Sequence, residues 1–116
     1  MHELGIALRI AEIATRIARQ EGLLKVDLVH VEVGELSGIV PEALLFSFES
    51  ATKNSFLEKA KLKINLISAA ARCNKCQREF SPGGFFSLCP GCGENDCEII
   101  AGKELFIKSI VSENGK

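Results

Sequence analysis

The chain has 116 residues, the size of one ordinary domain or of one domain with a small insertion. Hydrophobic residues make up 47% and charged residues 25%, which excludes a disordered chain, and the formal net charge of −1 gives no general attraction to nucleic acid or to anionic membranes. No stretch approaches the roughly 20 apolar residues of a membrane span, and charged residues interrupt the run that a secretory signal would need. We therefore expect a cytoplasmic globular protein with reduced cysteines.

Two helices are predicted. Apolar residues recur at helical spacing from Leu4 to Gln20, and Gly22 suits a C-terminal stop. Pro41 suits the first turn of the second helix. The inward stripe that we predict for this second helix contains Leu44, Leu45, Phe48, Ala51 and Thr52.

Three segments have the pattern of strands. Residues 28–34 alternate, so we expect Val29, Val31 and Val33 on the buried face and His30 on the solvated one. Residues 61–66 alternate in the same way, and residues 105–111 form another β-prone run. The predicted fold class is α+β, a small sheet with two helices, and the cysteine-containing segment is an insertion into it.

Four cysteines form two tight pairs in that insertion. Cys73 and Cys76 form one Cys-x-x-Cys motif, and Cys89 and Cys92 form the other, twelve residues further on. Two such turns supply the four thiolates of a tetrahedral zinc site, which is closed to substrate water and therefore structural. Gly93 after the second turn permits a left-handed backbone. Disulfides and an iron–sulfur cluster are weaker alternatives in a reducing compartment.

The fifth cysteine, Cys97, lies outside the paired spacing. We interpret it as a small, partly buried side chain near the end of the insertion, with a spare ligand or a redox partner as the less favoured alternative.

Two other functions remain open from the cysteine motifs. Zinc ribbons often bind nucleic acid, but three basic against four acidic residues in 72–98 make a poor phosphate footprint, which favours protein–protein contact. A Cys-x-x-Cys motif also occurs in thiol oxidoreductases, although two pairs favour metal binding over redox chemistry.

The N-terminus offers a second metal site. In Met1-His2-Glu3, a free α-amine, a deprotonated amide and the His2 imidazole can close two fused chelate rings. Such nitrogen-rich square-planar sites favour Ni(II) or Cu(II). Alone this signal is weak, because many chains have a histidine near the N-terminus by accident, and Glu3 suits a helix start equally well.

The order of motifs resembles the HypA family of hydrogenase maturation factors. The resemblance is carried by Met1-His2-Glu3-Leu4, Gly34-Glu35-Leu36-Ser37-Gly38, the two cysteine pairs and the closing 105–110, and it covers nearly the whole chain. Two local departures, Gly5 in the first helix and Asn54-Ser55 after the second, touch no proposed ligand.

The resemblance implies a nickel metallochaperone, not an enzyme, with Ni(II) as cargo and structural Zn(II). It implies a nickel-binding domain of residues 1–70 and 99–116 and a zinc-binding domain of residues 71–98. His2 would be the essential nickel ligand, helped by Met1 and Glu3, and Cys73, Cys76, Cys89 and Cys92 would hold zinc.

The same resemblance implies protein partners, a HypB-like GTPase and the [NiFe]-hydrogenase large subunit, and neither nucleic acid nor membrane. Whether a urease is also served stays open. The surfaces that we would test first for partner binding are residues 40–48 and the tip at residues 83–86.

Overall fold

The computed structural model describes residues 3–82 and 88–112. The chain forms two compact units. The first contains Met1–Glu32, Ile39–Asn65 and Phe106–Lys116, and the second contains Val33–Gly38 and Leu66–Leu105.

Two helices pack against each other in the first unit, α1 (Glu3–Gln20) and α2 (Pro41–Thr52). The buried residues of α1 recur three or four apart and are mostly alanine, which lets the helix approach its neighbours closely: they are Glu3, Ala7, Ile10, Ala14 and Ala18. Gly22, with φ +74°, follows the end of α1 as predicted. Among the described helices, none combines the length and the apolar character that crossing a membrane requires.

The inward stripe of α2 is narrower than the sequence predicts. Leu44, Phe48 and Thr52 are buried, and the Thr52 hydroxyl donates to the Phe48 carbonyl at 2.8 Å. Leu45 is instead 41% exposed, so its predicted inward position is wrong. Residues at i and i+4 share one line along a helix, whereas Leu45 lies about 100° further round.

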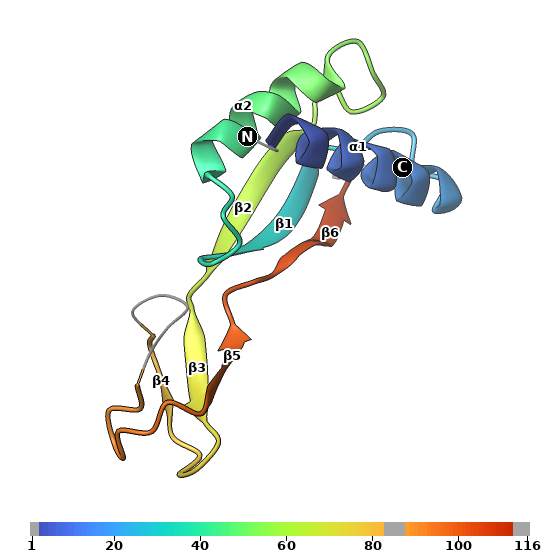
Figure 1. Cartoon of the computed structure of the whole chain (residues 1–116). Helices are drawn as coiled ribbons and strands as arrows, with labels where there is room; N and C mark the ends of the chain where they lie inside the picture. The colour runs from blue at the N-terminus through green and yellow to red at the C-terminus, as the bar shows by residue number, and fades with distance from the viewer. Residues whose placement is uncertain (1–2, 83–87, 113–116) are drawn as a thin grey trace. The chain divides into compact units, whose positions relative to one another are not determined.

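A three-stranded sheet has the order β2 (Lys61–Ile67), β1 (Leu28–Gly34), β6 (Leu105–Val111), as Figure 1 shows. Backbone bonds from Lys61 N–H to Asp27 O at the start and from Glu35 N–H to Ile67 O at the end make β1 and β2 parallel, with α2 as the crossover. β6 runs antiparallel to β1, because Asp27 N–H donates to Val111 O while Gly34 N–H donates to Glu104 O.

The central strand supplies the core of the larger sheet, because its alternate residues Val29, Val31 and Val33 are fully buried. Burying one such side chain contributes about 1.5–3 kcal/mol. On its other face, Glu32 accepts from Asn65 Nδ2 at 3.2 Å and pairs with Lys108 Nζ at 3.4 Å. The predicted α+β class and the alternation of this strand are confirmed.

His30 differs from the prediction of a solvated side chain. It lies on the same face as Glu32 and is half-buried, but its Nε2 atom is shielded from solvent and has no hydrogen-bond partner among the described residues.

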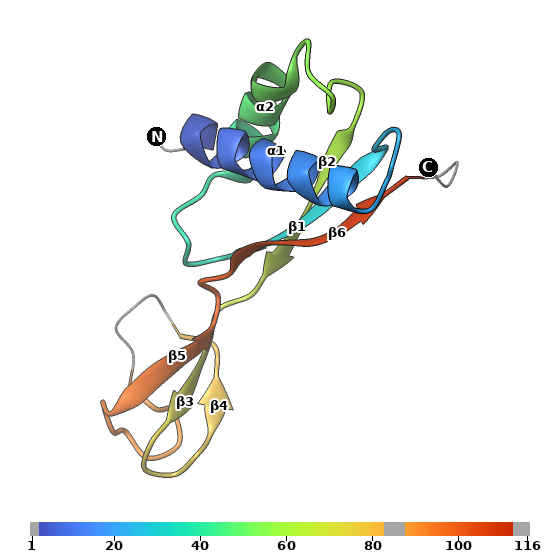
Figure 2. The ribbon, with the colours of Figure 1, turned by 90° about the vertical axis from the view of Figure 1, so that its right-hand side faces the viewer.

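The second unit contains a smaller sheet that the sequence analysis missed. Its order is β4 (Glu79–Phe80), β3 (Ala70–Cys73), β5 (Cys97–Ala101), and β3 is antiparallel to both neighbours (Figure 2). The register pairs Ala70 with Ala101 and Cys73 with Cys97. These strands have four, two and five residues for β3, β4 and β5, too few for periodicity in the sequence to reveal them.

Within the second unit, the loop after β1 holds the segments on either side of the small sheet. The Glu35 carboxylate accepts from Ala69 N–H at 2.7 Å, and Leu36 N–H donates to Gly102 O at 2.6 Å. A side chain at Gly34 would collide with the Gly102 backbone, and one at Gly102, where φ is +112°, would lie 2.8 Å from Ala69 Cα. Residues 34–36 therefore join the segment that enters the small sheet, at Ala69, to the segment that leaves it, at Gly102. We call this set of contacts the clasp.

Candidate metal centre

The first cysteine pair forms a tight turn at the end of β3. The N–H groups of Lys75 and Cys76 point at Cys73 Sγ, at 3.3 and 3.4 Å, and Gln77 N–H donates to the Cys73 carbonyl at 2.9 Å. Gln77 takes the left-handed conformation, with φ 68°. The chain then returns through a bond from Cys73 N–H to Arg78 O at 2.9 Å, which starts the pairing of β3 with β4.

The second pair repeats this turn. The N–H groups of Gly91 and Cys92 point at Cys89 Sγ, at 3.3 and 3.5 Å, and Gly93 N–H donates to the Cys89 carbonyl at 2.9 Å. Gly93 is left-handed as predicted, with φ 78°. Backbone donors aimed at sulfur stabilise the thiolate form, which is the form that binds metals.

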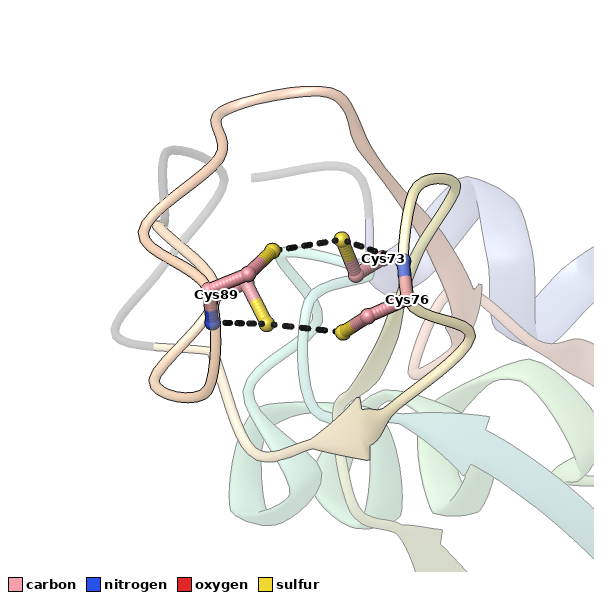
Figure 3. Close-up of side chains that lie close together, drawn as sticks. Cys73, Cys76 and Cys89 are labelled. Atoms are coloured by element: carbon pink, nitrogen blue, oxygen red, sulfur yellow. Dashed lines mark hydrogen bonds between the residues drawn. The ribbon is translucent and has the colours of Figure 1, made fainter.

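The two turns face each other and bring all four sulfurs together (Figure 3). Every Sγ of Cys73, Cys76, Cys89 and Cys92 lies within 4.8 Å of the others. Cys73 Sγ is 3.5 Å from Cys92 Sγ, and Cys76 Sγ is 3.5 Å from Cys89 Sγ. A tetrahedral zinc site with Zn–S bonds of about 2.3 Å has sulfurs about 3.8 Å apart. A disulfide would need about 2.05 Å. The cluster therefore fits a structural zinc site.

The pKa values of the thiols differ across the cluster. Backbone N–H groups, that of Cys76 first, lower the pKa of Cys73, and the N–H of Cys92 helps to lower the pKa of Cys89 to about 6. Cys92 accepts from the Glu94 N–H, which lowers its pKa, but crowding by Cys73 and the other sulfurs outweighs this and raises it to about 12. The polypeptide alone does not ionise all four thiols at neutral pH, whereas a bound dication stabilises every thiolate.

Cys97 lies beside the cluster without joining it. It is half-buried, opposite Cys73 in the register of β3 and β5, and its Sγ faces the Glu94 carbonyl at 3.6 Å. Burial, together with the nearby charge of Cys73, raises the pKa of its thiol. These features are typical of a structural cysteine rather than of a reactive one.

The surface of this unit carries local charge pairs. Arg72, one of its three basic residues between 72 and 98, bonds the Glu98 carboxylate at 2.9 Å and lies 3.9 Å from that of Glu79. A guanidinium that is held between two carboxylates makes a weak phosphate contact, which adds to the charge count against nucleic-acid binding.

At the N-terminus, Met1 and His2 lie outside the described residues, as does the 83–86 tip. Glu3 starts α1 and is only 7% exposed. Its carboxylate accepts from Val40 N–H at 3.2 Å, and Val40 is the N-cap of α2. The side chain of Glu3 thus ties the starts of the two helices together, which sequence spacing did not reveal because the partners are 37 positions apart.

The fold and the four-sulfur cluster define a small α+β protein with a structural metal module. Comparison with known proteins gives the family. The family described as "Hydrogenase/urease nickel incorporation, metallochaperone, hypA" matches residues 1–112. The chain belongs to the HypA family.

Individual relatives agree with this assignment. The Hydrogenase maturation factor HypA of Chlorobium luteolum is 38% identical over 111 residues, covering 96% of this chain and 95% of the relative. That of Parabacteroides distasonis is 40% identical over 111 residues, covering 96% of each. The solution structure of the Ni metallochaperone HypA from Helicobacter pylori, 23% identical, has a similar fold, with a TM-score of 0.68 over 95% of this chain and 96% of that one. A second solution structure of a HypA protein, also 23% identical, has a TM-score of 0.72 over 95% of this chain and 94% of that one.

Proposed function

We propose that this chain is a nickel metallochaperone that binds Ni(II) at its N-terminus and delivers it during [NiFe]-hydrogenase maturation. The observation that carries the proposal is membership of a nickel-incorporation family over residues 1–112, in a chain that begins Met1-His2-Glu3. In this proposal the protein is not an enzyme and works in the cytoplasm. It meets a HypB-like GTPase and the hydrogenase large subunit.

His2 is the essential ligand in this proposal, because an imidazole and neighbouring backbone nitrogens form the donor set that Ni(II) prefers. Met1 supplies its α-amine and Glu3 its backbone nitrogen. The Glu3 carboxylate, bonded to Val40 N–H, anchors the start of α1 at the last of these three ligand residues. A site at the chain terminus releases its metal with little reorganisation, which suits a carrier.

Cys73, Cys76, Cys89 and Cys92 are the zinc ligands in the same proposal. Their convergence within 4.8 Å and the paired N–H donors support this assignment. Zinc would supply the fixed crosslink that a small unit with a limited hydrophobic core needs. Because all four positions are taken by sulfur, this site would have no role in transfer of nickel.

The first test is metal analysis with Ni(II) titration on the untagged protein with its native N-terminus. We expect one zinc per chain and a nickel site that is lost in His2→Ala. The matched control is His30→Ala, which removes the chain's other histidine and should leave nickel binding intact. Nickel binding that survives His2→Ala with zinc still present would contradict the ligand set.

The proposed ligands also predict a pH dependence. An imidazole and a backbone amide must lose protons before they coordinate, so nickel affinity should fall as pH drops from about 7.5 to about 5.5. Isothermal titration calorimetry at the two pH values measures the nickel affinity. Equal affinities would exclude the proposed donor set.

A further inference from the structure

A groove in the first unit runs between helix α2 and the edge strand β2. Leu45, Phe46 and Glu49 line it from the helix, Lys61 and Leu62 line it from the strand, and its volume is about 400 Å³. An adjoining recess of about 330 Å³ shares Glu49 and Lys61 and continues along Lys53 and Lys59. The two cavities share Glu49, Ala60 and Lys61, and we call them together the α2–β2 groove.

Apolar side chains open into this groove without a partner in the described chain. Phe46 is 71% exposed and Leu45 41%, next to Phe48, which is 2% exposed and belongs to the core. A large aromatic side chain that is exposed on a helix beside a recess is typical of a residue that contacts a binding partner rather than of a core residue.

The strand that borders the groove has a free edge. β2 pairs only with β1 among the described strands. Lys61 N–H points to β1, where it donates to Asp27 O. Because backbone groups alternate along a strand, Leu62 and Ile64 direct their N–H and C=O groups to the open edge. The same two residues point their side chains to the helix side, where Leu62 lines the groove.

The residues that line the groove carry a small excess of positive charge, three lysines against two glutamates. Lys53, Lys59 and Lys61 line the recess and Lys63 follows on the strand, all exposed, against the two carboxylates of Glu49 and Glu58. A second copy of this chain is a poor occupant, because pairing two β2 strands would bring their lysines together. An acidic segment matches the excess positive charge.

We propose that the α2–β2 groove binds an extended segment of a partner protein as an added β-strand. The backbone of the segment bonds the Leu62 and Ile64 edge, alternate apolar side chains enter beside Leu45 and Phe46, and an Asp or Glu between them meets the lysines. This inference does not depend on the nickel ligands, so nickel titration of each variant separates the two.

The test selects peptides from a phage library of random dodecapeptides on the full, zinc-loaded protein. The strongest peptide is then synthesised with a fluorescent label and its affinity is measured by fluorescence polarisation. The groove variants are Phe46→Ser and Lys61→Glu. Matched controls outside the groove are Leu24→Ser, a leucine that is 78% exposed, and Arg16→Glu on the exposed side of α1.

We expect selected peptides that alternate apolar and acidic residues. Both groove variants should weaken binding about tenfold or more, the controls should change it by less than about twofold, and the amide NMR signals of Leu62 and Ile64 should shift when the peptide is added. The proposal is overturned if no peptide is enriched above background, if the groove variants bind like the controls, or if the amide signals stay in place. It is also overturned if light scattering shows a dimer that Phe46→Ser disrupts, because a second copy would then occupy the groove.

Discussion

Gln77 and Gly93 occupy the same position in the two cysteine turns, one residue after the second cysteine of each pair, and both have left-handed φ angles of 68° and 78°. Each N–H donates at 2.9 Å to the carbonyl of the first cysteine of its turn. The turns are therefore alike in geometry and unlike in sequence, since only one uses the residue that adopts this conformation without strain.

This relationship predicts opposite effects for reciprocal substitutions. Gly93→Gln should weaken zinc binding by about 1 kcal/mol, roughly fivefold, because a side chain is strained at this φ angle. Gln77→Gly should strengthen it by less, because glycine also adds freedom to the unfolded chain. Competition with a chromogenic chelator measures both. Weakened binding in Gln77→Gly would show that the Gln77 side chain does more than tolerate the turn.

The four sulfurs predict a sharp difference among the cysteines. Cys89→Ser should lose zinc and lower the thermal stability of the protein, because three thiolates no longer close the site. Cys97→Ser should retain one zinc per chain, since Cys97 lies outside the cluster. Native mass spectrometry reads the zinc directly. Zinc loss in Cys97→Ser would require a ligand role for that thiol.

The thiol pKa values predict how zinc is lost on acidification. The folded pKa of Cys89 is lowered from 9.0 to about 6, so its thiolate contributes stability that is fully present above the unfolded pKa and is lost as pH falls through the folded value. Bound zinc competes with protons for the thiolates, so zinc release should begin only as the pH falls below neutrality. A dye-based zinc-release titration should show a plateau at neutral pH. A midpoint at or above about pH 7 would contradict the role of the N–H donors.

Replacement of Gly34 and of Gly5 by alanine should change the free energy of unfolding in opposite directions. Gly34→Ala should destabilise the protein by roughly 2 to 5 kcal/mol, because the new Cβ would overlap the Gly102 backbone. Neither segment can move away without breaking the hydrogen bonds of the clasp. Gly5→Ala should stabilise it by about 0.5–1 kcal/mol, since nothing lies within 4 Å and alanine favours the helix. Urea unfolding with the zinc in place compares the two. Equal changes would mean that the close approach at Gly34 relaxes.

The residue pattern of the sequence predicted both helices and the strands β1 and β2 through their periodicity, and it predicted β6 as a β-prone run. It did not predict β3, β4 and β5, where metal-binding turns rather than alternation set the register. The spacing of the four cysteines predicted their convergence. The contact from Glu3 to Val40 and the clasp from Glu35 to Ala69 could not be predicted, since each joins residues more than thirty positions apart that no local pattern relates.

The pairing of Ala70 with Ala101 has a topological consequence. The chain enters the small sheet at Ala70 and leaves it at Ala101, and these two residues are paired. The segment between them is therefore a loop whose two ends are held together by backbone pairing. Closing a loop in this way costs an entropy that grows only slowly with length. Evolution could therefore lengthen, shorten or exchange the segment between Ala70 and Ala101 while the strands that lead into it keep their pairing.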